Sequence, residues 1–182
     1  MKRFLLVLIT AISVTANAQL KLNLKSGTYN LTEGSYLQIQ SSSPTYGVAL
    51  WDHAVLAEDK KALVDLGVEL FHYLPENAFE VRLPKGVSAS DLKAAGVRAF
   101  TAWTPRMKLD GPLSIGDIPP WAVLNDGNIA VQFLTAPEFS TSLRYTKGML
   151  PLQDGWYTAS LKIKDLEKLA KEPHILLSLI HI

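Results

Sequence analysis

The alternation of hydrophobic and polar positions predicts that residues 46–109 form a compact unit of short strands and helices. Residues 78–83 alternate cleanly, as a half-buried strand does. Leu63 and Leu66 recur at helical spacing, and Gly67 follows them where helices often end. The predicted elements are strands at 48–51, 68–74, 78–83 and 97–103, with helices at 57–66 and 88–95. Their order, β-α-β-β-α-β, is the ferredoxin-like pattern, in which two helices cover one face of an antiparallel sheet.

The same order of strands and helices recurs, less regularly, in residues 128–182. A turn at 150–155 and a helix at 164–170 ended by Pro173 repeat features of the first unit. The stretch 137–145, where the first helix should lie, is rich in Ser and Thr and has no good cap. The predicted strands of this half lie at 128–134, 156–163 and 174–180. The fold class predicted is α+β, with tandem ferredoxin-like units, antiparallel sheets and a degenerate second copy.

Turn-forming residues separate these units from one another and from the start of the chain. A polar arm ends in a run of serines, and a stretch of Pro, Gly and Asp joins the two units. Within the arm, 36–40 alternates like a short strand. The predicted organisation is a signal peptide at 1–18, an arm and linker at 19–45, a first unit at 46–109, a linker at 110–127 and a second unit at 128–182.

The first 18 residues carry the three parts of a secretory signal peptide. Lys2 and Arg3 precede an apolar run, and Ala16 and Ala18 fit the A-x-A pocket of a signal peptidase, so that cleavage falls before Gln19. A transmembrane anchor would need about 20 apolar residues, whereas polar residues interrupt this run. The sequence therefore predicts export to the periplasm, the cell surface or the medium, with no membrane attachment after cleavage.

Charge and cysteine content exclude several classes of function. Taking Lys2 and Arg3 from the 18 Lys and Arg leaves 16, against 17 Asp and Glu, so the mature net charge is about −1. Nucleic acid is not an expected partner, because its binding depends on basic residues that neutralise phosphates. The chain contains no cysteine, which excludes disulfides and thiolate chemistry.

The residues that usually carry catalysis or bind metal are scattered. No serine stands in a G-x-S-x-G turn. Asp52 and His53 are adjacent, and on a strand adjacent residues point to opposite faces, so we expect no metal site, no cofactor and no catalytic residue. A cryptic enzyme site involving His72 stays open as a weak alternative. The four histidines are His53, His72, His174 and His181.

Four tryptophans admit two interpretations. Three lie in or beside predicted strands, as buried anchors do, but exposed tryptophans also stack on sugars. An exported adhesion or surface-assembly module that contacts glycan or protein is therefore the alternative function. The tryptophans are Trp51, Trp103, Trp121 and Trp156.

The segment 60–83, with its core Tyr73-Leu74-Pro75-Glu76-Asn77-Ala78, resembles the N-terminal prodomain of exported subtilisin-like serine peptidases of the fervidolysin type. The segment 24–27 is similar to one that follows the signal in Bacteroidetes members. About 60 residues carry the resemblance well.

The resemblance implies a prodomain that aids folding of a subtilisin-like peptidase domain and blocks its cleft. The peptidase domain would be either downstream in the same chain (in cis) or a separate chain (in trans). The family's D-[ST]-G, H-G-T-H and G-T-S-M-A motifs are missing from the sequence, so the resemblance implies a non-catalytic chain, and we expect a fragment of a peptidase precursor. The residues predicted to contact the peptidase are Leu74, Pro75, Glu76, Asn77 and Phe79.

Overall fold

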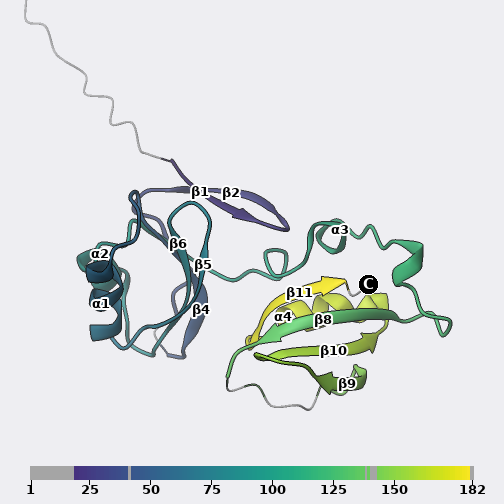
Figure 1. The fold of residues 1–182 in the computed structure, drawn as a ribbon. Helices are drawn as coiled ribbons and strands as arrows, with labels where there is room; N and C mark the ends of the chain where they lie inside the picture. Colours follow the sequence, from purple (N-terminus) through teal and green to yellow (C-terminus); the bar gives the residue numbers. More distant parts are fainter. Residues whose placement is uncertain (1–18, 41, 138, 140–142, 181–182) are drawn as a thin grey trace, which may run out of the picture.

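The computed structural model describes residues 19–40, 42–137, 139 and 143–180, and these form two units that lie side by side (Figure 1). The predicted signal peptide at 1–18 lies outside the described residues, and Gln19 is the first residue of a strand. Both units combine strands and short helices, so the predicted α+β class is confirmed. No helix among the described residues is long and apolar enough to cross a membrane.

The first unit is a five-stranded sheet with strand order β3-β7-β4-β6-β5. β4, β5, β6 and β7 pair antiparallel, and β3 adds a parallel strand beside β7, which makes the sheet mixed. Helices α1 and α2 lie together on one face (Figure 1). The elements are β3 (Tyr36–Leu37), β4 (Thr45–Leu50), α1 (Ala57–Asp65), β5 (Glu69–Leu74), β6 (Ala78–Leu83), α2 (Ala89–Ala94) and β7 (Ala99–Ala102).

Local chemistry explains why these helices begin and end where they do. Ser88 Oγ accepts a hydrogen bond from the Asp91 amide, and the Asp91 carboxylate accepts one from the Ser88 amide, so α2 starts with a capping box. Gly67 follows α1 with φ +75°, which glycine adopts without strain. Leu63 of α1 and Leu92 of α2 are fully buried against Val81 and Phe100 of the sheet.

The segment predicted as a polar arm is instead a packed hairpin. β1 (Gln19–Leu24) and β2 (Gly27–Thr32) pair antiparallel, and Leu20, Leu22 and Leu31 pack on the sheet face opposite the helices. The strand expected at 36–40 is only the two-residue β3, because Gln38 takes a left-handed backbone with φ 62°. The hairpin thus covers apolar surface that the first sheet would otherwise leave open.

The second unit is a four-stranded antiparallel sheet with strand order β11-β8-β10-β9. The predicted turn at 150–155 begins later than expected, because residues up to Pro151 belong to β9. Four residues of the stretch 137–145 lie outside the described residues, and the described ones, such as Leu143, are not helical. The elements are β8 (Ile129–Thr135), β9 (Lys147–Pro151), β10 (Trp156–Leu161), η2 (Ile163–Asp165), α4 (Leu166–Lys171) and β11 (Ile175–Ile180).

The stretch predicted as a linker, 110–127, holds two short helices, α3 (Gly111–Ser114) and η1 (Pro120–Ala122). Leu113 of α3 packs into the core of the second unit. The two units also share a small core of their own, formed by the buried residues Tyr46, Leu134, Ala136 and Leu176. This junction positions the cavities described below.

Candidate functional site

The turn between β5 and β6 carries most of the residues predicted to contact a peptidase. Leu74 pairs with Ala78, so that three residues form the loop. Pro75 and Glu76 are exposed, while Leu74 and Asn77 are half-buried. The structure therefore presents this turn on the surface.

Two hydrogen bonds hold the turn in place. The carbonyl oxygen of Asn77 accepts from the Trp51 amide at 3.0 Å, and the Glu76 carboxylate accepts from Asn23 Nδ2 of the β1–β2 hairpin at 3.3 Å. Glu76 and Asn77 both have positive φ, 66° and 59°, which is unusual for residues other than glycine. The surrounding contacts fix this uncommon backbone.

Phe79, in β6, points into the core of the first unit. It is 8% exposed, and its ring packs edge-on against Trp51 and Tyr73 at centroid distances of 6.5 and 5.4 Å. Lys60 Nζ stands 4.9 Å from the centre of the same ring. Phe79 thus supports the turn from the core.

A buried carboxylate lies directly behind the turn. Glu80 is 4% exposed, and its two carboxylate oxygens hydrogen-bond His72 Nδ1 at 2.9 Å and Trp103 Nε1 at 3.2 Å. Burial raises the pKa of Glu80, and the hydrogen bonds from His72 and Trp103 partly oppose the rise. The only sequence feature that points to Glu80 is its place between the apolar residues Phe79 and Val81 of a strand, and this feature does not identify its partners.

A cavity of about 450 Å³ opens next to this cluster, between the hairpin, the first sheet and the second unit. Its walls are mainly apolar, and the polar part comes from Glu80 and His72 together with Asn23 and Lys25 of the hairpin. Such a cavity, apolar with a few convergent polar groups, is a usual form of binding site. The other main wall residues are Leu74, Pro75, Trp103, Met107, Trp156 and Leu176.

The remaining histidines are dispersed. His53 hydrogen-bonds Asp52 Oδ1 at 2.8 Å and Asp59 Oδ2 at 3.1 Å, so the expectation that Asp52 and His53 point apart is wrong, because they lie in a bend and not in a strand. The hydrogen bond with Asp52 raises the pKa of His53. Among the described residues, no three His, Asp or Glu side chains are grouped to hold a metal ion. His181 lies outside the described residues.

The tryptophans divide between core and surface. Trp51 is 1% exposed and packs in the core of the first unit. Trp103 and Trp156 are half-buried at the junction of the two units. Trp121, in η1, is 57% exposed.

Comparison with known proteins identifies a family but no characterised relative. No curated protein and no solved structure matches the chain. The family described as Domain of unknown function (DUF8729) matches residues 14–104, half of the sequence. The matched segment includes the β1–β2 hairpin, the first sheet through β7 and the turn at 74–78. The chain therefore belongs to the family described as Domain of unknown function (DUF8729).

Proposed function

We propose that this chain is the non-catalytic prodomain of an exported subtilisin-like serine peptidase, and that it inhibits the peptidase domain and assists its folding by binding to it. The observation that carries the proposal is the turn at 74–78. The residues with the most specific resemblance to such prodomains form an exposed, firmly held loop.

We also propose that each unit is a ferredoxin-like copy, as the order of elements along the sequence predicts. The strand orders β7-β4-β6-β5 and β11-β8-β10-β9 support this. Both place the first and third of the four strands in the centre and the second and fourth outside them, with β3 added beside β7 in the first unit. In the second unit, α4 precedes β11 as α2 precedes β7.

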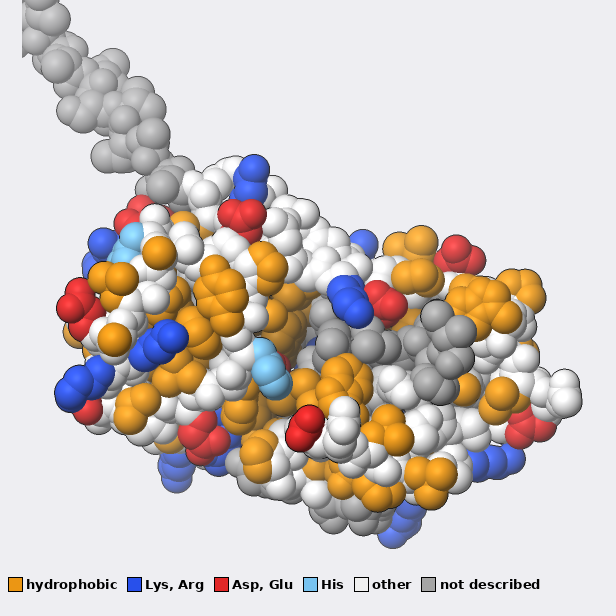
Figure 2. Space-filling view, viewed as in Figure 1, with side chains coloured by type: hydrophobic (Ala, Val, Ile, Leu, Met, Phe, Trp, Pro, Cys, Tyr) orange, Lys and Arg blue, Asp and Glu red, His pale blue; other side chains and the backbone are white. Residues whose placement is uncertain are grey.

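The geometry suits recognition by a preformed surface. β5 is an edge strand, and an edge strand can pair with an extended segment of a partner. Tyr73, at the end of this strand, is 58% exposed and stands beside Pro75 and Glu76. Figure 2 shows hydrophobic side chains gathered on one face of the molecule, over both units. Because the turn is already fixed by hydrogen bonds, its ordering costs little entropy on binding.

The proposal is tested with residues 19–182 and the subtilisin-like peptidase encoded with them. The purified chain should slow peptide hydrolysis and raise the yield of refolded peptidase. The double variant Tyr73→Ala, Glu76→Lys should raise the inhibition constant at least tenfold, because both side chains stand at the proposed contact.

Gln153→Lys supplies the control, since Gln153 lies in an exposed turn of the second unit and the change also introduces a lysine. It should leave the inhibition constant within twofold. A wild-type chain that neither inhibits the peptidase nor improves its refolding would contradict the proposal.

Trp121 favours a second candidate, an exported adhesion module. It is exposed, and Ile115 (71%) and Leu124 (42%) in the same connecting segment are exposed as well. Exposed aromatic rings beside apolar side chains can stack on sugar rings. Binding on a glycan array that disappears in Trp121→Ala but persists in Tyr73→Ala would support this function in place of the first.

A further inference from the structure

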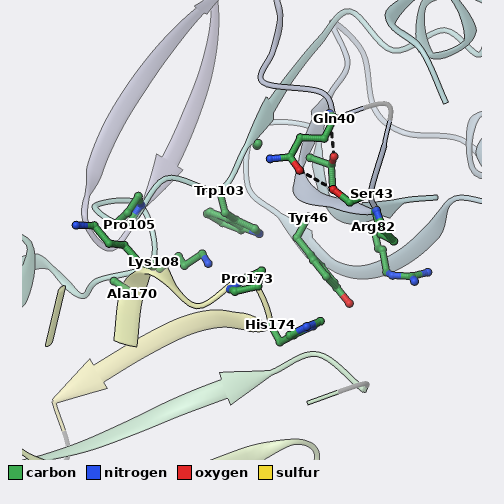
Figure 3. A pocket seen from close by; sticks show the side chains of 14 residues that line it. Gln40, Ser43, Tyr46, Arg82, Trp103, Pro105, Lys108, Ala170, Pro173 and His174 are labelled. Carbon is green, nitrogen blue, oxygen red and sulfur yellow. Dashed lines mark hydrogen bonds between the residues drawn. The ribbon is translucent and has the colours of Figure 1, made fainter. Parts of the chain in front are cut away.

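A second cavity, of about 560 Å³, lies on the other side of Trp103, between the start of β4 and the connection from α4 to β11. Figure 3 shows Trp103, Lys108, Pro173 and His174 surrounding one space, with Tyr46 beside them. Both units contribute walls to this cavity. It does not include the turn at 74–78.

The walls combine apolar surface with positive charge. Trp103, Pro105 and Pro173 provide apolar surface. The charged side chains among the described lining residues are Arg82, Lys108 and Lys171, and that lining contains no Asp or Glu. Arg82 forms an ion pair with Glu69 at 2.7 Å, and Lys171 forms one with Glu167 at 2.7 Å. Lys108 therefore makes the main contribution to the positive charge of the cavity.

Lys108 is the most unusual of these residues, because it is only 3% exposed. Its ammonium donates a hydrogen bond to the carbonyl oxygen of Glu172 at 2.8 Å, the one hydrogen bond that it makes within the described part of the chain. An ammonium has three N–H donors. Donor capacity therefore remains at a buried cation beside the cavity.

The carboxylates that face Lys108 already have other partners. Glu172 accepts a hydrogen bond from the Tyr145 hydroxyl at 3.0 Å, and Glu80 bonds His72 and Trp103. Burial lowers the pKa of Lys108 to about 8, although Glu172 and Glu80 oppose this shift. The charge of Lys108 is thus incompletely balanced by the residues around it.

His174 gives a second, independent sign of an unfilled polar site. Its Nδ1 atom is buried and has no hydrogen-bond partner among the described residues. The ring of His174 meets Tyr46 edge-on at a centroid distance of 6.1 Å. Buried polar atoms without partners are rare in folded proteins, and a bound ligand is one way to satisfy them.

We propose that this cavity binds an organic carboxylate with an apolar, preferably aromatic, body. The carboxylate lies against the Lys108 ammonium, and the body lies between Trp103, Tyr46 and Pro173. The ligand is either a free small acid or the C-terminal residue of a peptide, since both present the same group. The site is independent of peptidase binding by the turn.

The test compares ligands that differ only in charge. N-acetylphenylalanine should bind residues 19–182 in calorimetric titration at pH 7, and its primary amide should bind at least tenfold more weakly. Peptides that end in Phe, with a free or an amidated C-terminus, form the second arm. Tighter binding of the free-acid peptide than of N-acetylphenylalanine assigns the site to peptide ends, and equal binding assigns it to small acids.

Lys108→Met, which keeps an unbranched side chain one atom shorter and removes its charge, should weaken binding of the acid at least tenfold. Lys93→Met, at an exposed position in α2, should change it less than twofold. The ¹³Cε resonance of Lys108 in the wild-type chain provides a readout that needs no variant. Its pKa should rise from about 8 when the acid is bound. Affinity should therefore fall as the pH rises from the pKa of Lys108 in the free protein to its higher pKa in the complex.

Equal binding of acid and amide, absence of binding at millimolar ligand, or an unchanged Lys108 titration would each overturn the proposal.

Discussion

Gly47 is the residue at which β4 passes closest to β7. A Cβ atom at this position would overlap the Thr101 carbonyl oxygen and the ring of Phe100. Thr101 and Phe100 belong to the strand paired with β4, so neither can move aside without disturbing the sheet. The requirement for glycine here is steric, since every larger residue carries a Cβ atom.

Gly47→Ala should therefore lower the free energy of unfolding by about 2 kcal/mol or more, the size expected for overpacking in a core. Gly34→Ala is the control, because Gly34 has φ +83° but open space around it, and should cost about 1 kcal/mol. Urea unfolding followed by circular dichroism measures both. Equal losses in the two variants would show that the overlap is relieved at no cost.

Glu80 should make stability depend on pH. Burial raises its pKa in the folded state, so the folded protein keeps a proton that the unfolded chain releases. This contribution to stability is fully present below the pKa of unfolded Glu, about 4.3, and is lost as the pH rises through the folded pKa.

The glutamine in the variant Glu80→Gln cannot ionise. The free energy of unfolding of this variant, relative to that of the wild type, should therefore increase between pH 4 and pH 7. Urea unfolding at several pH values measures the difference. Glu58→Gln is the control, because it also removes one carboxylate but at an exposed position. If the difference in free energy of unfolding between Glu80→Gln and the wild type stays constant or declines over this range, the pKa of Glu80 is not raised in the folded protein.

At the scale of elements, the β1–β2 hairpin acts as a cover for the first sheet. Leu22 is fully buried between this hairpin and residues such as Val48 and Leu50 of β4. Its neighbour Lys21 points to solvent, as expected from the alternation of side chains along a strand.

Leu22→Ala should reduce the free energy of unfolding by about 2–4 kcal/mol, the range for a large buried aliphatic residue. Lys21→Ala should change it by less than about 0.5 kcal/mol. Thermal and urea unfolding measure both. A small effect of Leu22→Ala would mean that the hairpin is a dispensable arm, as its sequence had indicated.

The elements that the sequence predicted well are those with a clear period. Residues 57–66 and 78–83 carry strong helical and strand patterns, and both form the expected element. The hairpin at 19–32 was missed because its turn-forming residues obscured the alternation of Leu20, Leu22 and Leu24. β9 was not predicted, and its last two residues were assigned to a turn, because it contains Gly148 and Pro151, which usually interrupt strands.

The candidate site was predictable only in part. The turn at 74–78 could be located because Pro75 and Asn77 are local turn signals. The cluster of His72, Glu80 and Trp103 could not, since it depends on the register of separate strands and on long-range packing.

At the scale of the whole molecule, the two units are joined by more than their connecting chain. Leu134 and Leu176 of the second unit are buried together with Tyr46 of the first. Lys108, near the end of the first unit, adds a hydrogen bond to the carbonyl oxygen of Glu172 in the second unit. This junction forms walls of both cavities, so their shape depends on how the units pack.

Leu134→Asp should place a charge in this junction, lower the free energy of unfolding by about 3 kcal/mol or more and allow the two units to unfold separately. Leu150→Asp, at a position 60% exposed in β9, is the control and should leave one transition. Calorimetry reports the change as a van't Hoff enthalpy below the calorimetric enthalpy. A single transition in Leu134→Asp would show that the junction does not couple the units.

Pro151 has a consequence for self-association. β9 is the outer strand of the second sheet, and the Leu152 amide bonds inward to Trp156 at 2.8 Å. Because successive amides point in opposite directions along a strand, the nitrogen of Pro151 faces outward, where it has no hydrogen to donate. A strand of a second copy of the chain could therefore not accept a hydrogen bond from the nitrogen of Pro151 at this edge. The second sheet, which has the exposed Leu150 on its edge strand, is thereby protected from polymerising along this edge.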